Sequence, residues 1–340
     1  MADGMIVLSP RARGLGRFIL VRLAQVVPVV LGIAVLNFFI LHLAPGDIVD
    51  VLAGDSGGAT PEYMAELRHR FGLDQPVWVQ FYRYLLNLAQ FNFGYAYRHG
   101  MPVFALIASR LPSTLLLMGV SLLLTVTVST ALGVLSATRV RTWVDQGISI
   151  LVLVAHSIPG FWLGLMAIVL FSAKLGWLPS GGMVSLDRAG QGWGALVLDV
   201  ARHLVLPAAT LAVFYLAVYT RLVRSSLLEL HGADFVRTAR AKGAGEARVI
   251  LVHALRNALL PLVTMLGYQL ASLLSGSVVV ESVFGWPGLG RLIFDAVLAR
   301  DLNLLLGILF LSSILVTLLN VAVDVAYRLL DPRVAVGGRR

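Results

Sequence analysis

The chain has 340 residues, of which 58% are hydrophobic and only 13% are charged, and its mean hydropathy is +0.85. An ordinary soluble domain carries about 25% charged residues, so this composition is typical of a chain that lies mostly in lipid. The sequence contains 0 cysteines, which excludes disulfides, thiolate metal sites and thiol nucleophiles. The net charge of +9 does not indicate nucleic acid, because the basic residues lie mainly between apolar runs.

Six apolar stretches are long enough to cross a bilayer, whose core of about 30 Å needs roughly 20 apolar residues per helix. They are residues 18–41, 111–137, 147–173, 204–222, 259–280 and 302–325. Pro28, Pro159 and Gly267 fall inside them, and membrane helices tolerate such residues where neighbours satisfy the freed backbone groups. The four-residue spacing of Gly160 and Gly164 allows either a close approach of two helices or simple relief of crowding. We therefore expect an all-α membrane protein with six transmembrane helices.

Orientation follows from the distribution of Lys and Arg, because cytoplasmic loops carry an excess of both. One alternate set of loops and tails holds most of the 27 basic residues and fewer than half of the 18 acidic ones. Its basic residues are Arg11, Arg13, Arg17, Arg22, Arg139, Arg141, Arg221, Arg224, Arg237, Arg240, Lys242, Arg248, Arg256, Arg328, Arg333, Arg339 and Arg340. Both termini are therefore expected in the cytoplasm.

The first apolar stretch is interpreted as an uncleaved span. It is too long for the apolar region of a signal peptide, and residues 44–47 (APGD) follow it in place of an A-x-A cleavage site. The predicted layout is a cytoplasmic segment 1–17, a first span 18–41, an external helical loop 42–110, a transmembrane core 111–325 containing the cytoplasmic loop 221–260, and a cytoplasmic tail 326–340.

The long external loop is expected to form two helices. Thr60 and Pro61 are typical of an N-cap and a first helical position, and residues 63–71 continue with helical spacing. Residues 77–88 form an amphipathic run rich in aromatic residues, which suit the level of the lipid headgroups. Both helices are expected to cap the outer mouth of the protein.

The cytoplasmic loop 221–260 is predicted to contain a short capped helix. Asp234 is a good N-cap, residues 235–242 make about two turns, and Gly243 stands where a left-handed residue ends a helix. Phe235 and Ala239 share one face, and Arg237 and Arg240 share another. So short a helix is unstable alone in water and needs a partner surface, which is either the chain's own helix ends or a soluble motor protein. A second helix is expected over residues 246–257, leading to Pro261 at the start of the fifth span.

Two runs in this loop carry a specific resemblance. Residues 234–243 (DFVRTARAKG) and 253–261 (HALRNALLP) resemble the EAA loop of the dipeptide, oligopeptide and nickel permeases of ABC importers. The general pattern begins Glu-Ala-Ala, whereas this chain has Arg237, Thr238 and Ala239, and Arg256 replaces a proline. These departures are typical of the peptide-permease branch.

The resemblance extends along nearly the whole chain. Further matching segments are residues 43–47 (LAPGD), 71–76 (FGLDQP), 111–114 (LPST), 176–179 (GWLP), 280–290 (VESVFGWPGLG) and 331–333 (DPR). Residues 91–96 (FNFGYA) depart from the Gly-Asp-Phe-Gly-x-Ser that the family often shows in the external loop. Because that segment faces the side of substrate delivery, the departure weakens any transfer of substrate identity.

The resemblance implies the type I ABC importer permease fold in a bacterial inner membrane. It implies an alternating-access pathway shared with a second homologous permease, two cytoplasmic ATPase subunits that bind ATP and Mg, and an extracytoplasmic solute-binding protein. This chain itself is expected to bind no cofactor and to be no enzyme. Its only lysines, Lys174 and Lys242, are followed by Leu175 and Gly243, so the Gly-Lys-Ser/Thr of a Walker A motif does not occur.

Three groups of site residues are expected on this basis. The contacts for the ATPase subunits are Asp234, Phe235, Arg237, Thr238, Ala239, Arg240, Lys242, Gly243 and Arg256. The substrate pathway is assigned to His156, Ser157, Pro159 and Gln269. The external gate or binding-protein contact is assigned to Glu281, Trp286, Pro287 and Gly288, in a segment that is either a re-entrant turn or a tight solvated loop.

Other chemistries find less support. No two of the seven histidines are spaced as a helical metal pair. An intramembrane ionisable group such as His156 can mark a functional site. We interpret His156 instead as a hydrogen-bonded residue of the helix bundle. We place Asp324 near the cytoplasmic surface rather than in a proton relay, which leaves a proton-coupled secondary transporter as the alternative function. Residues 54–58 (GDSGG) match the G-x-S-x-G pattern of serine hydrolases but lack its strand–turn–helix context, so an intramembrane protease is the weaker alternative.

Overall fold

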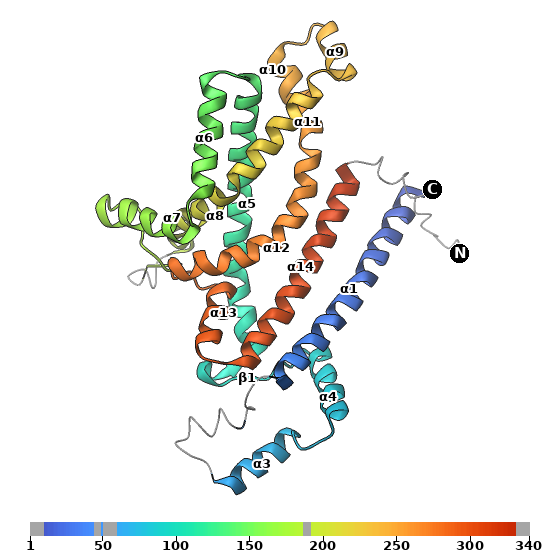
Figure 1. The fold of residues 1–340 in the computed structure, drawn as a ribbon, viewed down its shortest axis with the longest axis vertical. Coiled ribbons are helices and arrows are strands. Elements are labelled where there is room, and N and C mark those ends of the chain that lie inside the picture. Colours follow the sequence, from blue (N-terminus) through green and yellow to red (C-terminus); the bar gives the residue numbers. More distant parts are fainter. Residues whose placement is uncertain (1–9, 44–48, 50–59, 186–191, 331–340) are drawn as a thin grey trace. The chain divides into compact units, whose positions relative to one another are not determined.

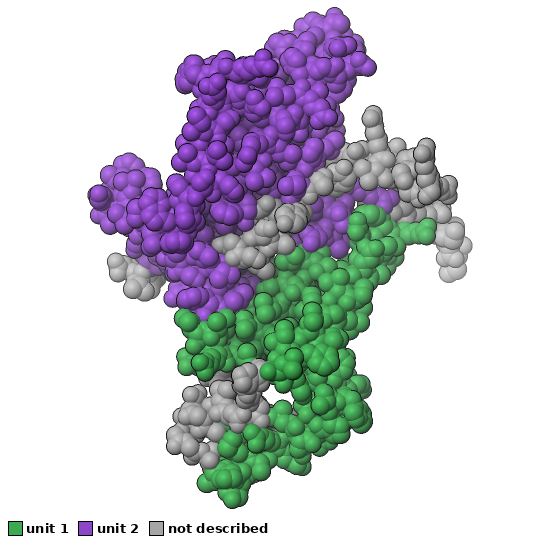
Figure 2. Space-filling view, viewed as in Figure 1, with its two compact units in different colours: residues 1–108, 296–317 green, residues 109–295, 318–340 purple. Residues whose placement is uncertain are grey.

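The computed structural model describes residues 10–43, 49, 60–185 and 192–330, and most of them are helical (Figure 1). The chain divides into two compact units, which Figure 2 distinguishes by colour. Unit 1 comprises residues 1–108 and 296–317, and unit 2 comprises residues 109–295 and 318–340. Each unit is described by itself.

Unit 1 begins with a long helix and continues with the external loop predicted from the sequence. Its elements are α1 (Pro10–Leu43), α3 (Pro61–Phe71), α4 (Val77–Ala89), the strand β1 (Tyr95–Ala96), the 3₁₀ turn η1 (Tyr97–His99) and the strand β2 (Met101–Pro102). The two strands pair antiparallel, with Tyr95 opposite Pro102 and Ala96 opposite Met101. Both helices expected in the loop are present, and the N-cap is confirmed because Thr60 Oγ1 accepts the Tyr63 N–H at 3.3 Å.

The core of unit 1 is formed by apolar side chains from α1, α4 and the part of α14 that belongs to this unit. Ala34, Leu88 and Phe310 form its buried cluster. The Phe38 ring contacts the Phe81 ring, with 5.0 Å between centroids. One buried amide, Asn37, donates to the Leu306 carbonyl at 3.3 Å, so its polar group is satisfied inside the core.

Unit 2 holds most of the remaining helices. Its elements are α5 (Val103–Thr138), α6 (Trp143–Ser157), α7 (Gly160–Ala167), the π-helix η2 (Ile168–Lys174), α8 (Trp193–Leu230), α9 (Asp234–Ala241), α10 (Glu246–Arg248), the π-helix η4 (Val249–Ala254), α11 (Leu255–Ala258), α12 (Leu260–Val283), α13 (Leu289–Leu298) and α14 (Leu302–Leu330), of which α5, α13 and α14 also contribute residues to unit 1. Helix α8 supplies the largest share of the buried core, including Tyr215 and Tyr219. A Cβ on Gly133 would lie 2.7 Å from Val223 Cβ, so α5 and α8 approach closely at this glycine.

Among the described residues, four helices are long and apolar enough to cross a membrane. They cover Gly16–Leu43, Val103–Thr138, Trp193–Leu230 and Leu302–Val325, and a bent pair, Trp143–Ser157 with Gly160–Lys174, makes a possible fifth. The predicted span 259–280 coincides with α12, whose backbone is helical from Leu260 to Val283. A total of six spans remains a prediction.

The third predicted span, residues 147–173, is not one continuous helix, because the helix breaks after Ser157. Helix α6 and the segment Gly160–Lys174, which comprises α7 and η2, meet at an angle of 99°. Ile158 between them is extended, with φ −78° and ψ 129°. A residue before proline is sterically disfavoured in the α conformation, so Pro159 ends α6 here instead of being tolerated within a helix.

The two glycines of α7 differ in their surroundings. A Cβ on Gly164 would lie 3.1 Å from Phe284 Cε2 and 3.2 Å from Val283 Cγ1, whereas nothing lies within 4 Å of the same position on Gly160. The close helix approach that the spacing allowed is therefore found at Gly164 alone.

Candidate functional site

Helix α9 is the short helix that the sequence predicted for the loop 221–260, one residue earlier than expected. Its N-cap is Ala233, with φ −66° and ψ 146°, and no side chain caps the helix. The prediction that Asp234 is the N-cap is therefore wrong. Asp234 is the first helical residue, and its carboxylate still lies in the first turn, where the helix dipole favours negative charge.

The C-terminal end of α9 has the geometry expected of a glycine stop. Gly243 has φ +79°, a left-handed conformation that costs a residue with a Cβ more than it costs glycine. Its N–H donates to the Arg240 carbonyl at 2.9 Å, and the Ala244 N–H donates to the Ala239 carbonyl at 3.2 Å. This pair of bonds is the Schellman motif, so the prediction that Gly243 is the left-handed residue that ends the helix is confirmed.

Helix α9 presents one face to its own chain and another to the outside. Val236 and Ala239 are buried in the same cluster as Val249 and Ala254 of the following helical segment. Phe235 is 40% exposed, so it does not share the environment of Ala239 as its spacing suggested. The other exposed side chains in this stretch are those of Asp234, Arg237, Thr238, Ala241 and Lys242.

Arg240 does not belong to this open face. Its guanidinium donates to Glu246 through Nε to Oε1 at 2.7 Å and through Nη2 to Oε2 at 3.2 Å. Nη1 also donates to the His231 carbonyl at 3.4 Å. The hydrogen bond from Arg240 lowers the pKa of Glu246, and the same bond raises the pKa of Arg240. The pair ties the end of α9 to the start of α10, which leaves Arg240 engaged within the chain.

The predicted second helix of the loop is present but not regular. It runs through α10, the π-helix η4 and α11, from Glu246 to Ala258. Arg256 lies exposed on α11, and Pro261 stands in the first turn of α12, as expected.

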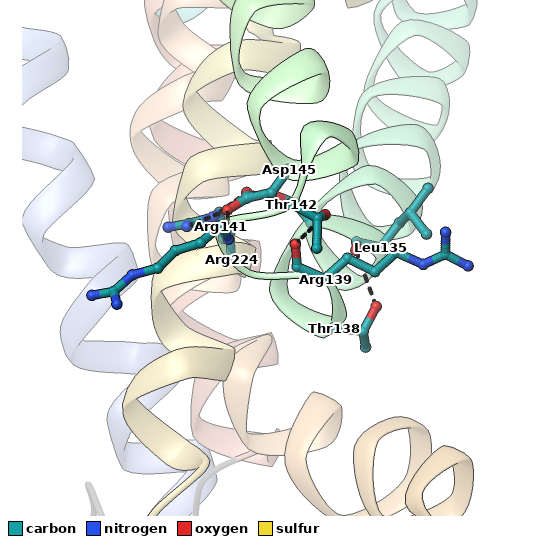
Figure 3. Close-up of polar contacts among 8 residues, drawn as sticks. Leu135, Thr138, Arg139, Arg141, Thr142, Asp145 and Arg224 are labelled. Atoms are coloured by element: carbon teal, nitrogen blue, oxygen red, sulfur yellow. Dashed lines mark hydrogen bonds and ion pairs between the residues drawn. The ribbon is translucent and has the colours of Figure 1, made fainter.

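A buried ion pair joins α6 and α8 in unit 2. Arg224 donates to Asp145 through Nε to Oδ1 and through Nη2 to Oδ2, both at 2.8 Å. The Arg141 N–H donates to Oδ2 at 3.0 Å, and the Ser136 hydroxyl of α5 donates to Oδ1. Figure 3 shows Asp145 and Arg224 pointing toward one another beside the short connection that carries Arg141. One carboxylate therefore links α5, α6 and α8.

The turn after α12 is organised around a second buried carboxylate. Glu281 accepts the Thr114 hydroxyl at 2.8 Å and the Arg291 N–H at 3.0 Å. Thr114 Oγ1 in turn accepts the Leu289 N–H at 2.7 Å. Gly288 packs directly against the Glu281 carboxylate, where a Cβ would have no room. The network connects α5 to the first turn of α13.

This burial corrects the prediction for the external segment. The side chains of Glu281 and Trp286 are both 0% exposed, Gly288 is buried, and Pro287 is half-buried. Trp286 Nε1 donates to the Ser113 carbonyl at 2.9 Å. Glu281 and Trp286 therefore stabilise the turn from within, and their side chains are not placed to touch a separate binding protein.

Three of the four residues assigned to a substrate pathway, His156, Ser157 and Pro159, lie at the bend between α6 and α7. His156 Nδ1 donates to the Phe214 carbonyl at 2.8 Å, as expected for a hydrogen-bonded bundle residue. Ser157 Oγ donates back to the Leu153 carbonyl at 2.9 Å. The side chain of Gln269 lies outside the described set. The bend holds an open cleft of about 520 Å³, lined by Leu153, Val154, Ser157, Ile158, Pro159, Phe161 and Trp162.

Within the described residues, no group of three or more His, Asp or Glu side chains is placed to hold a metal ion. The hydrolase-like pattern at residues 54–58 falls outside the described part of the chain.

The sequence matches two family descriptions that together cover most of its length. Residues 129–336 match "Binding-protein-dependent transport system inner membrane component", and residues 15–118 match the N-terminal region of such membrane components. The chain belongs to this family. It is therefore a permease subunit of an ABC importer and a multi-pass protein of the inner membrane.

Individual relatives of this permease agree with the assignment. It is 42% identical over 316 residues to a putative peptide transport system permease protein of Brucella suis, covering 93% of this chain and 98% of the relative. It is 40% identical over 319 residues to the oligopeptide transport system permease protein AppB of Bacillus subtilis, with the same two coverages. It is 37% identical over 334 residues to the dipeptide transport system permease protein DppB of Escherichia coli, covering 94% of this chain and 98% of the relative.

A solved structure supports the fold of the permease. A chain of the MetNI methionine ABC transporter, in inward-facing conformations, aligns with a TM-score of 0.52 at 23% identity. The alignment covers 66% of this permease and 96% of the MetNI chain. It supports the type I ABC importer permease fold expected from the sequence.

Sequence reasoning gave no role in the permease to Asp145 or Thr114. Asp145 lies in the first turn of α6, directly after the connection 139–141, which carries Arg139 and Arg141. An acid there, together with the arginines near the C-terminal end of α8, is a signal that could have suggested an ion pair. Thr114 could not have been paired with Glu281, because 167 residues separate the two in the chain.

Proposed function

We propose that this chain forms half of the translocation pathway for peptides or similar small solutes, and that a second homologous permease forms the other half. The proposal for the solute is supported by relatives at 37–42% identity whose names refer to peptide, oligopeptide and dipeptide transport. An extracytoplasmic solute-binding protein delivers the solute, and the chain itself works surrounded by membrane lipid.

The outward face of α9 is the proposed contact for the ATPase subunits, and this face is the observation on which the coupling role depends. Phe235 stands exposed between Asp234 and Arg237 on a helix whose opposite face is packed on its own chain. The Schellman turn at Gly243 and the Arg240–Glu246 pair hold the C-terminal end of that surface in place. An aromatic residue with basic neighbours on a rigid support is suited to insertion into a groove of another protein.

In this proposal ATP and Mg are bound by two cytoplasmic ATPase subunits, and this chain supplies neither an ATP site nor another cofactor site. Movement of α9 with the ATPase subunits changes the angle of the helices that follow it. The π-helix η4 contacts α9 and continues through α11 into α12, which gives a covalent path from the docking face to a helix of the core.

The test is Phe235→Ala, with Leu251→Ala as a matched control that removes an exposed apolar side chain from the same loop. Truncation of an aromatic anchor at an interface costs about 2 kcal/mol or more, so the ATPase subunits should co-purify about 30-fold less efficiently. Solute uptake and solute-stimulated ATP hydrolysis should fall with them, while Leu251→Ala retains both. Normal co-purification of Phe235→Ala would remove the docking role. Uptake that persists without ATPase subunits and collapses with the proton gradient would instead support the secondary-transporter alternative.

A further inference from the structure

Helix α4 of unit 1 carries more apolar surface than its packing uses. Phe81, Tyr84, Leu85 and Leu88 pack against the core of the unit. A second set, Trp78, Tyr82 and Leu86, repeats every fourth residue and is exposed by 72%, 61% and 43% respectively. We call these three residues the α4 stripe. Residues four apart lie on one side of a helix, so the stripe is a continuous exposed band next to the packed side.

The polar residues of α4 occupy only a narrow sector. At about 100° per residue, Gln80, Arg83 and Asn87 cover roughly a third of the circumference, and the apolar residues cover the rest. The Gln80 amide donates to the carbonyls of Leu73 and Gln75 at 3.1 and 2.8 Å, so this sector faces the turn between α3 and α4. The apolar sector is wider than expected for a helix that packs one face on protein and exposes the opposite face to water.

Contacts within unit 1 fix the depth of α4 relative to two candidate membrane spans. The Phe81 ring meets the Phe38 ring edge to face, and Phe38 lies five residues before the end of the span Gly16–Leu43, or about 7 Å along the helix. Leu88 is buried with Ala34 and Phe310. Ala34 lies about 13 Å inside the end of the α1 span, and Phe310 lies about 12 Å inside the start of the span Leu302–Val325. Two helices therefore place Leu88 at the same depth.

We propose that α4 lies in the membrane, in the leaflet where α1 ends and α14 begins, and that lipid covers the α4 stripe. A hydrocarbon half-layer is about 15 Å deep, so a side chain 12 to 13 Å inside both spans lies well below the headgroups. Figure 1 shows α4 beside the end of α1, the helix on which it packs. Trp78 and Tyr82, nearer the start of α4, stand at the level where amphipathic aromatic rings are enriched, and Leu86 lies deeper.

The chemistry of the stripe agrees with lipid as its cover. The stripe itself contains no charged side chain, and Arg83 points into the polar sector at the α3–α4 turn, where its Nη1 lies beside Gly72. An anchored α4 would hold the external helix α3 and the hairpin of β1 and β2 at a fixed height above the membrane.

The test uses the absence of cysteine from the chain, which has 0 of them. Trp78→Cys, Tyr82→Cys and Leu86→Cys are each made in the full-length chain, which is purified with its associated subunits, labelled with a nitroxide and placed in lipid nanodiscs. Collision of the nitroxide with molecular oxygen, which concentrates in lipid, is compared with collision with a water-soluble nickel chelate. The ratio of oxygen to nickel accessibility should be several-fold higher at all three positions than in water and should rise in the order 78, 82, 86.

Three reference positions calibrate the result. Leu36→Cys, on an exposed side of the α1 span, gives the value in lipid, and Glu66→Cys, exposed on α3, gives the value in water. Asn87→Cys is the matched control on the polar sector of α4 itself. Its ratio of oxygen to nickel accessibility should be lower than that of Leu86→Cys. Access of the nickel chelate to the stripe equal to that at Glu66→Cys would overturn the proposal. So would protection of the stripe from both reagents, because a protein would then cover it.

A second measurement needs no cysteine. Brominated lipids quench tryptophan fluorescence on contact. They should therefore reduce the emission of the unmodified chain by a larger fraction than the emission of Trp78→Phe, which has no tryptophan at position 78. Equal quenching in both proteins would contradict the placement of Trp78 at the membrane.

Discussion

Asp145 and Arg224 form a two-point ion pair that spans α6 and α8, with both nitrogen–oxygen distances at 2.8 Å. The carboxylate is 6% exposed and also accepts a main-chain N–H and the Ser136 hydroxyl. A carboxylate surrounded in this way is stabilised only while the cation is present, because neutral donors do not offset its lost hydration.

Arg224→Ala should therefore destabilise the permease strongly. Removal of one partner of a buried pair costs about 3 to 5 kcal/mol, and the cost should be near the lower end because the Arg224 side chain is 30% exposed. The measurement is the thermal unfolding midpoint of the purified protein in detergent.

The double variant Asp145→Leu/Arg224→Met provides the control for the ion-pair prediction. Apolar replacement of both partners of a buried pair is often neutral, so the midpoint should recover much of the loss. Equal destabilisation by the single and double variants would mean that packing at this position, rather than charge, holds the helices together.

Thr114→Val should loosen the turn that follows α12. The valine has the shape of threonine but can neither donate to Glu281 nor accept the Leu289 N–H, so two buried groups each lose a partner, at about 1 to 3 kcal/mol each. Amide hydrogen exchange of residues 285–291 should accelerate, and Thr114→Ser should retain the slow exchange. Unchanged exchange in Thr114→Val would show that the other partners of Glu281 are sufficient.

The Arg240–Glu246 pair should make the order of the α9 end depend on pH. Because the folded-state pKa of Glu246 is lowered from its usual 4.5, the pair contributes fully above that value and is lost as the pH falls through the lowered pKa. Exchange of the α9 amides should therefore quicken in acid, once the intrinsic exchange rate is corrected for pH. Glu246→Gln should exchange at its own constant corrected rate across the same range. A parallel acid response in both proteins would assign the effect to another group.

Local sequence signals predicted most of the helices and their ends. Contacts between distant segments determined which side chains are buried and which partners they have. Thr60 and Gly243 were identified from residue type and position alone, because a cap depends on its immediate neighbours. The boundary of α9 shifted by one residue because Ala233, which has no side-chain acceptor, occupies the N-cap position. The break at Ile158 had a clear local cause in Pro159, but the same type of residue at Pro112 and Pro207 leaves its helix unbroken.

The roles of Glu281 and Phe235 show the limit of reasoning from spacing. A glutamate in a Gly- and Pro-rich segment is consistent with an exposed loop, and only the fold brings Thr114 and the α13 N-terminus around it. Phe235 and Ala239 are four residues apart, yet the residues of α9 that are buried are Val236 and Ala239, and Phe235 is exposed. Helical spacing defines which residues share a face, but the partner surface decides which face is buried.

Gly243→Val should uncouple the permease without preventing its insertion. A β-branched side chain at φ +79° is strained by about 1 to 2 kcal/mol, so the Schellman turn opens and the α9 surface loses its fixed position. Uptake and solute-stimulated ATP hydrolysis should both fall while the amount of chain in the membrane stays normal. Gly245→Ala is the matched control, because Gly245 has φ −64° and no atom within 4 Å of its would-be Cβ. If Gly243→Val transported as well as Gly245→Ala, a fixed α9 end would not be required for coupling.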